Sequence, residues 1–499
     1  MGDEKQKKGM YAIFVHAGAG YHSREHEDQH LDACRLAAMA GMNFLRNGGT
    51  AVDAVEVAIA MMENAVITNA GYGSNLNAKG TVECDASIVD HFGRSGACGA
   101  VPSIKNPIML ARKIYDQAYK APGLQRVPPN LLAGEGAADF AWNHGLVLVP
   151  DELLVSPSAK ARWESWCKEI VEWEKEWPEE AAKDPFGAWI RTPEASKATR
   201  LSQIEMELQA EIQGAMRRAP GPSKNPEVSN PLKVGNSLHS DGSRSMTQSD
   251  AALQAGSMSN EIGSISLDQS APTGTFEAPS QDADEPMDDP REGEDMITDT
   301  VGAIAIDMFG NIAAGSSSGG IGMKHQGRVG PAALIGIGTH VIPVDPTDPE
   351  ETAVAAVTSG TGEHIASSFG ASTCANRVYF SQRKDRAGSF AHVSDEEAIS
   401  AMIKKEFADH PAVVNSEFSG SIGILCAKKT VDSIAFHFAH NTESFAVGSM
   451  SCYDQAPSCL MSRSPRRGAV AQGGVMIRPP KSTDSGEYKK RKRKGDRDS

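Results

Sequence analysis

Thr300 stands where a polar stretch gives way to an apolar run, in the segment EDMITDTVGAIAID that covers residues 294–307. A hydroxyl needs a base to become a nucleophile, and a threonine at the start of a chain carries one in its own α-amine. The pKa of such an amine is near ~7.7, which suits a base at neutral pH. A cut between Asp299 and Thr300 would therefore place nucleophile and base in one residue, without a catalytic histidine.

An isolated Asp-Thr pair is far more often a plain connection into a strand, so the surrounding sequence has to support this chemistry. A nucleophile of this kind also requires donors for the developing oxyanion. Glycine-rich segments that could supply them occur at residues 69–77 (NAGYGSNLN), 317–330 (SSGGIGMKHQGRVG) and 359–364 (SGTGEH). Each is also a typical turn. A dinucleotide site is disfavoured, because GAGYHS lacks the third glycine of that fingerprint and no glycine loop continues as Gly-Lys-Ser/Thr.

The composition predicts a sizeable core that is diluted by unfolded sequence. The chain has 499 residues, 40% of them hydrophobic and 23% charged, with a net charge of −15. This charge argues against general nucleic-acid binding and leaves basic or peptide partners open. The eight cysteines form no C-x-x-C pair, so neither a metal site nor a disulfide framework is indicated. The apolar run near the N-terminus is too short for a signal peptide or a membrane span, which favours an intracellular protein.

Hydrophobic patterning divides the chain into five regions. Strand-like and helical segments alternate over residues 11–156 and again over 300–475, which predicts an α/β fold. Residues 157–217 form a charged helical region with an apolar stripe, residues 218–299 an acidic spacer that we expect to be disordered, and residues 476–499 a basic tail. Composition alone leaves open whether the two ordered blocks are two domains or one interrupted domain. The stripe comprises Trp163, Trp166, Ile170, Trp173 and Trp177, and such a stripe is more often a packing face than a binding device.

Several motifs occur together and in order along both ordered blocks. They are HAGAG (16–20), NAGYGSNLN (69–77), ECDASIVD (83–90), IKNPIMLAR (104–112), TVGAIAID (300–307), SSGGIGMKHQGRVGPAAL (317–334) and SGTGEH (359–364). Together they resemble the threonine-nucleophile N-terminal hydrolases of the type 2 asparaginase family. Within that family the sequence looks most like its threonine aspartase (taspase) branch. The resemblance implies a four-layer αββα sandwich built from both blocks, and autoproteolysis between Asp299 and Thr300 into α and β subunits.

The same resemblance assigns roles to individual residues. Thr300 matches the nucleophile, and Ser318 matches a second hydroxyl that hydrogen-bonds it. Ser359 and Gly360 match a pair that lines the oxyanion side of the site, where Asn69 also lies. Arg328 matches the arginine that holds a substrate carboxylate, a task suited to its two-pronged guanidinium. No metal or other cofactor is implied.

Two further positions bear on the substrate. Family members that act on free asparagine have an acidic residue three positions after the arginine, where it holds the α-amine; here that position is Pro331. A site that keeps the carboxylate grip but loses the amine grip fits an aspartate inside a polypeptide. Taspase targets carry acidic residues beyond the cut, so Lys324 is a candidate contact for them, with a solvated surface lysine as the equal alternative.

The main hypothesis is thus a self-processing threonine endopeptidase that cuts proteins after aspartate. An L-asparaginase or isoaspartyl peptidase of the same fold is the alternative, and a non-catalytic platform built on the tryptophan stripe and the spacer is a third. Expected partners are aspartate-containing proteins, nuclear regulators among them, with no direct contact to nucleic acid or membrane. Pairing of αβ units into an (αβ)2 assembly is left open. Six consecutive basic residues (489–494) favour a nuclear as well as a cytoplasmic location, and a solvated charge run is the competing interpretation.

Overall fold

The computed structural model describes residues 9–118, 120, 123–181, 183, 300–466 and 468–480. All of these belong to one unit. The predicted spacer (218–299), including Asp299, lies outside the described residues, as do most of the region after residue 181 and the basic run of the tail. In the described ranges, no helix is long and apolar enough to cross a membrane.

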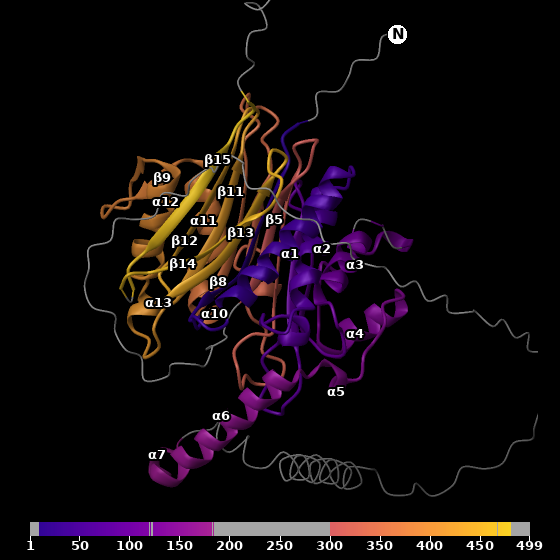
Figure 1. The fold of residues 1–499 in the computed structure, drawn as a ribbon, viewed down its shortest axis with the longest axis vertical. Coiled ribbons are helices and arrows are strands. Elements are labelled where there is room, and N and C mark those ends of the chain that lie inside the picture. Colours follow the sequence, from indigo (N-terminus) through magenta and orange to yellow (C-terminus); the bar gives the residue numbers. More distant parts are fainter. Residues whose placement is uncertain are drawn as a thin grey trace, which may run out of the picture. The chain divides into compact units, whose positions relative to one another are not determined.

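Two β-sheets form the centre of this unit (Figure 1). The eight-stranded sheet contains, in spatial order, β14 (Ser458–Arg463), β13 (Ser444–Ser451), β1 (Ala12–Gly20), β5 (Val301–Ile306), β6 (Ile312–Ser318), β2 (Cys84–Val89), β3 (Ser95–Val101) and β4 (Leu131–Ala133). The five-stranded sheet contains β15 (Ala471–Ile477), β12 (Ile434–His440), β11 (Ile422–Lys429), β8 (Ala353–Gly360) and β7 (Thr339–Ile342). A small hairpin is formed by β9 (Gln382–Lys384) and β10 (Phe390–His392).

Helices cover the outer face of each sheet (Figure 1). The eight-stranded sheet is covered by α1 (Glu27–Arg46), α2 (Ala51–Glu63) and α3 (Pro107–Ala118). The five-stranded sheet is covered by α11 (Gly370–Tyr379), α12 (Asp395–Ala401) and the π-helix η4 (Met402–Phe407). The remaining helices are η1 (Gly71–Gly73), η2 (Gly123–Gln125), α4 (Gly134–Asn143), α5 (Asp151–Leu154), α6 (Pro157–Glu176), α7 (Pro178–Ala181), η3 (Pro331–Ala333), α10 (Gly362–Ser368) and α13 (Pro411–Val414).

The side chains of strand β5 are buried on both faces of its sheet. Successive side chains of a strand point to opposite faces. Accordingly Val301, Ala303 and Ala305 pack in the cluster with α1 to α3, whereas Ile304 and Ile306 pack between the two sheets. A continuously apolar run such as VGAIAI is what a strand buried on both faces requires.

The two sheets pack directly on one another. The ring of Phe14 in β1 stacks on Phe436 in β12 with 4.5 Å between ring centroids. Three hydrophobic clusters thus alternate with the layers, one between the sheets and one under each set of helices. This confirms the predicted four-layer αββα sandwich.

Strands from the two ordered blocks interleave in the eight-stranded sheet. β1 pairs with β13 on one side and with β5 on the other, and β2 pairs with β6. Residues before and after the spacer therefore build one interrupted domain and not two separate domains.

Candidate active site

Thr300 lies at the head of β5, a central strand of the eight-stranded sheet. Its side chain is buried, and its backbone nitrogen donates a hydrogen bond to Ser359 Oγ at 3.1 Å. Ser359 belongs to β8 of the other sheet. The nucleophile predicted from the sequence is thus held where the two sheets meet.

The Ser359 hydroxyl accepts a second hydrogen bond, from the Ala19 nitrogen at 3.0 Å. Ala19 is the fourth residue of the HAGAG segment in β1. The hydroxyl is therefore bound between two backbone nitrogens, and one of them is the group that a cut would turn into the α-amine. Ser359 was predicted to line the oxyanion side, and the structure instead brings it to the nitrogen of the nucleophile.

Gly360 follows Ser359 with φ near +134°, a conformation that favours glycine. A Cβ at this position would overlap the carbonyl of Ser421, the residue before the neighbouring strand β11. Glycine therefore lets the chain leave the end of β8 and enter helix α10, which carries Gly362 and Glu363.

Ser318 ends β6, next to β5, in a ladder where Val301 lies opposite Ser317. Its Oγ accepts a hydrogen bond from the Gly320 nitrogen at 3.0 Å. The predicted hydrogen bond between Ser318 and Thr300 is not found among the residues that the structure describes. In the structure the hydroxyl instead closes the turn that begins at Gly319.

Asn69 fixes the same turn from the other side. Its Nδ2 donates to the Gly320 carbonyl at 2.8 Å, its Oδ1 accepts from the Asn75 nitrogen at 2.9 Å, and its own carbonyl accepts from the Gly319 nitrogen at 2.8 Å. A Cβ on Gly319 would lie 2.5 Å from Asn69 Oδ1. Asn69 thus lies beside the turn that follows Ser318, with both ends of its carboxamide bound to backbone. Its place on the oxyanion side of the site stays a prediction.

The charged groups of Arg328 and Lys324 differ in their exposure to solvent. The Nε and Nη2 atoms of Arg328 donate to Glu363 Oε1 at 3.0 and 2.8 Å, and the Glu363 side chain faces solvent. Lys324 is only 1% exposed, and its Nζ donates to the Glu83 carbonyl at 2.6 Å. The interpretation of Lys324 as a solvated surface lysine is therefore wrong. Its ammonium group is instead part of the buried wall behind Gly320.

Asp85 is a site residue that sequence reasoning did not single out. It is fully buried in β2 opposite Ser318, and it accepts hydrogen bonds from the Gly330 and Ala100 nitrogens at 2.7 and 2.8 Å. Burial raises its pKa, while the charges of Lys324 and Arg328 oppose that shift. The signal in the sequence was a lone aspartate inside an apolar strand, which implies a bound partner.

His16 lies in β1, directly opposite Gly302 of β5, the second residue after Thr300. Burial lowers its pKa to about 3, and the Thr300 backbone offsets part of that shift. The imidazole is therefore neutral at physiological pH. A Cβ on Gly302 would overlap His16 Nε2, so the glycine in TVGAIAID makes room for this ring.

Helix α6 packs against the loops of the site through the first part of the tryptophan stripe. A Cβ on Gly322 would overlap the Trp166 ring, and a Cβ on Gly80 would lie 3.2 Å from Trp163. Trp173 and Trp177, farther along, are 40% and 50% exposed. The stripe is thus a packing face at its start, as the sequence favoured, and is exposed beyond it.

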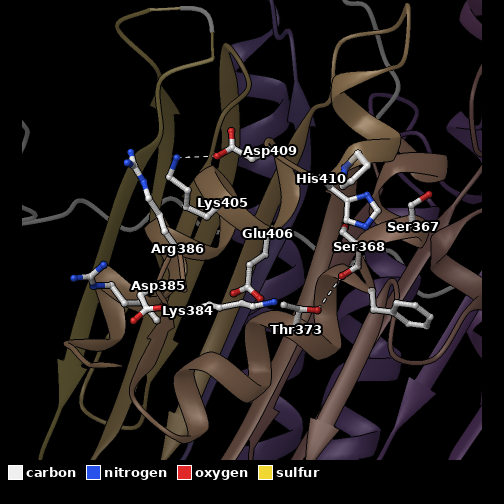
Figure 2. Close-up of a pocket in the computed structure, with 13 residues that line it drawn as sticks. Ser367, Ser368, Thr373, Lys384, Asp385, Arg386, Lys405, Glu406, Asp409 and His410 are labelled. Carbon is white, nitrogen blue, oxygen red and sulfur yellow. Dashed lines mark hydrogen bonds and ion pairs between the residues drawn. The ribbon is translucent and has the colours of Figure 1, made fainter. Parts of the chain in front are cut away.

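A hollow of about 890 Å3 lies apart from these residues, on the helical face of the five-stranded sheet (Figure 2). Two of its charged residues form ion pairs, Lys405 with Asp409 at 2.7 Å and Glu406 with Arg377 at 2.7 Å. No residue predicted for catalysis lines it. The predicted site and this hollow are therefore separate.

Comparison with known proteins places the chain in a family. The family model described as Asparaginase matches residues 9–187 and 204–443. The isoaspartyl peptidase/L-asparaginase of Danio rerio is 41% identical over 154 residues, which is 30% of this chain and 46% of that protein. The proteins of the same name from Xenopus laevis and Homo sapiens are 39% identical over 158 residues and 41% over 154, covering 48% and 47% of their lengths.

The matches to single relatives are partial, and the match to the family model is broad. The chain spans about half the length of the curated relatives it matches, whereas the family model extends over both blocks and includes Thr300, Arg328 and Ser359. The fold has the two stacked sheets and outer helices that such hydrolases share. The chain therefore belongs to the asparaginase family of N-terminal nucleophile hydrolases.

Proposed function

We propose that the protein is a self-processing amide hydrolase whose nucleophile is Thr300 after a cut at Asp299. The observation that carries this proposal is the hydrogen bond from the Thr300 nitrogen to Ser359 at the head of a buried central strand. Once the preceding peptide bond is broken, that nitrogen becomes an amine already fixed beside its own hydroxyl. Asp299 itself lies outside the described residues.

The proposed reaction has two halves. In the precursor, Thr300 Oγ attacks the Asp299 carbonyl carbon, the peptide nitrogen leaves as the new α-amine, and water then hydrolyses the resulting ester. In the mature protein, the amine takes the hydroxyl proton while Oγ attacks a substrate amide. The proton passes to the leaving nitrogen, and a water molecule hydrolyses the acyl ester to restore Thr300.

The substrate carries a carboxylate in this proposal, because Arg328 is the arginine nearest to the turn at Gly320 and its guanidinium already binds a carboxylate. The names of the relatives favour an isoaspartyl peptidase or L-asparaginase activity as the first candidate. Such substrates present an aspartyl group whose side-chain amide is cut and whose free carboxylate is held.

A second candidate, an aspartate-specific threonine endopeptidase of the taspase type, is favoured by Pro331. Proline has neither a charge nor a donor with which to hold a free α-amine. The Asp299-Thr300 pair is itself an aspartate followed by a cut site. In this version the same pocket serves self-cleavage and cleavage of other proteins, and the α and β subunits come from one precursor.

One set of proteins separates the candidates. Intact-mass measurements on wild type and Thr300→Ala test self-processing: the wild type should yield a fragment that begins at Thr300, and the variant should stay whole. A Thr300→Ala chain that still splits after Asp299 would exclude Thr300 as the nucleophile of self-processing. The processed wild type is then assayed on L-asparagine, on a β-aspartyl dipeptide and on peptides with internal aspartates. Release of ammonia or of the dipeptide's second residue supports the first candidate, and cuts after aspartate support the second.

A further inference from the structure

Arg328 is the proposed carboxylate-binding residue, and in the structure its guanidinium already binds a carboxylate. Both Nε and Nη2 donate to one oxygen of Glu363, Oε1, at 3.0 and 2.8 Å. An arginine fork that binds a carboxylate through two nitrogens is the arrangement expected for a bound acidic ligand. Glu363 thus occupies the guanidinium in the manner of such a ligand.

The guanidinium sits in a slot made by three glycines. A Cβ on Gly362 would lie 2.6 Å from Nη2, and one on Gly330 or Gly320 would lie 2.6 or 2.9 Å from Nη1. Any larger residue at these positions would displace the guanidinium. The position of Arg328 is therefore fixed by the backbone, independently of which carboxylate it binds.

The two acids near Arg328 differ in mobility. Asp85 is fully buried, accepts two backbone hydrogen bonds and lies 3.0 Å from the Cβ that Gly330 lacks. The Glu363 side chain is 60% exposed, against 15% for Arg328. Asp85 is thus a permanent counter-charge, whereas Glu363 can turn out into solvent without leaving Arg328 unbalanced.

We propose that Glu363 is an autoinhibitory residue, an internal carboxylate that binds Arg328 until the carboxylate of an acidic ligand displaces it. The proposal rests on the proposed function in one respect, the assignment of Arg328 as the substrate-binding arginine. A ligand without a carboxylate cannot displace Glu363, because it offers the guanidinium no negative charge. Glu363 therefore lowers the affinity of acidic ligands, which must displace it from Arg328, and leaves the affinity of ligands that do not displace it unchanged.

The test is a titration of the processed protein with two acidic probes, L-aspartate and the hexapeptide Glu-Asp-Met-Ile-Thr-Asp of residues 294–299. Calorimetry compares wild type with Glu363→Gln, which keeps the length of the side chain and its acceptor oxygen but removes the competing charge. We expect at least one probe to bind the variant more tightly, with a Kd lower by about tenfold, or ~1.4 kcal/mol. Succinamide, the uncharged diamide, should gain no such advantage.

The matched control is Glu397→Gln, since Glu397 pairs with Arg383 on an exposed surface outside the site. It should leave both Kd values unchanged. Unchanged or weaker binding of both acidic probes to Glu363→Gln would overturn the proposal, as would an equal gain for succinamide. Both probes are products of the proposed reactions, so their binding needs no turnover. Failure of the hydrolase assays would therefore count against the proposed function, and failure of the titration against acidic-ligand binding at Arg328 in competition with Glu363.

Discussion

The Thr300 nitrogen and the Ser359 hydroxyl lie 3.1 Å apart, although 59 residues separate them along the chain and they belong to different sheets. The same hydroxyl accepts the Ala19 nitrogen. One serine side chain thus joins the ends of three strands, β5, β8 and β1. Several consequences of this site and its surroundings can be measured.

Replacing Ser359 with alanine should slow both self-processing and hydrolysis. The change leaves two buried nitrogens without an acceptor, which costs about 1–3 kcal/mol, and it frees the amine that acts as the base. We expect kcat to fall about tenfold to a hundredfold, which is less than most of the ~10²–10⁴-fold that a placed base contributes, because the amine itself remains. Ser165→Ala, at a hydroxyl exposed on α6, is the control. A normal kcat in Ser359→Ala would show that this hydrogen bond has no role in catalysis.

Gly302→Ala should destabilise the protein. The added methyl group overlaps His16 Nε2 and lies 3.1 Å from a Val357 methyl group, in a core without free space. Overpacking of this kind costs about 1–3 kcal/mol, measurable as a loss in the free energy of unfolding by chemical denaturation. Gly136→Ala is a matched control, because Gly136 lies in α4 with open space around it. That variant should be neutral or gain up to ~1 kcal/mol from helix propensity. Equal losses in both variants would contradict the packing argument.

Buried Glu63 should make the protein less stable as the pH rises from 6.5 to 8. Desolvation raises its folded-state pKa from 4.5 to about 8, so the folded protein keeps a proton that the unfolded chain has lost. The stability this proton gives is complete below pH 4.5 and falls by up to ~1.4 kcal/mol per pH unit until pH passes the folded pKa.

Burial lowers the pKa of His16 from 6.5 to about 3, so below pH 6.5 the unfolded chain binds a proton that the folded protein does not. His16 therefore makes the protein more stable as the pH rises, but only below pH 6.5. The interval from pH 6.5 to 8 thus separates Glu63 from His16, and the difference between wild type and Glu63→Gln separates it from the Thr300 α-amine of a cut chain, which titrates in the same range. Thermal melts of Glu63→Gln should be flatter there than those of wild type or of Glu172→Gln, an exposed position on α6. A wild-type melting temperature that rises through this interval would contradict the assignment.

Trp166→Ala should disturb the site, whereas Trp173→Ala on the same helix should not. The Trp166 ring covers Gly322, two residues beyond the Gly320 carbonyl that Asn69 binds. Trp166 is half-buried, so its loss uncovers that loop, and we expect a loss of about 0.5–3 kcal/mol in the free energy of unfolding together with a lower kcat. Trp173 is 40% exposed, so its replacement should stay within about ±0.5 kcal/mol. Parallel denaturation and rate measurements on both variants check this contrast.

Patterned segments of the sequence predicted their elements well. The run AVDAVEVAIAMMENAV gave α2, which begins with a capping box between Thr50 and Asp53, and YAIFVHA gave β1. Strands poor in large apolar residues were missed, among them β3 (SGACGAV) and β15 (AQGGVMI). Small residues carry little hydrophobic signal, although they suit strands that helices approach closely.

Interruptions inside apolar segments were also missed. The pattern of residues 362–380 predicts a single helix, but the helix breaks at Phe369, where φ is +52°. The apolar run over residues 331–343 predicts a strand, but only Thr339–Ile342 is extended, after the short helix η3. In both places long-range packing outweighs local preference, and such packing is invisible in one sequence.

The same difference between local sequence patterns and long-range contacts applies to the candidate site. Thr300, Asn69 and Arg328 were identified through motifs, because their chemistry limits the residue types at those positions. The contacts from Ala19 to Ser359 and from Asp85 to Gly330 join distant segments, and only the folded chain reveals them. The burial of Lys324 likewise depends on Glu83, a residue 241 positions away.

The interleaved order of the eight-stranded sheet has a consequence for a chain cut before Thr300. Strands β1 and β2 from the first fragment are each hydrogen-bonded to strands of the second, on both edges in the case of β1. Neither fragment then possesses a complete sheet of its own. Melting becomes a dissociation into two molecules, so recovery after denaturation depends on the protein concentration, whereas the intact precursor refolds as a single molecule. Processing thus turns a reversible unimolecular equilibrium into one that dilution drives towards loss of the enzyme.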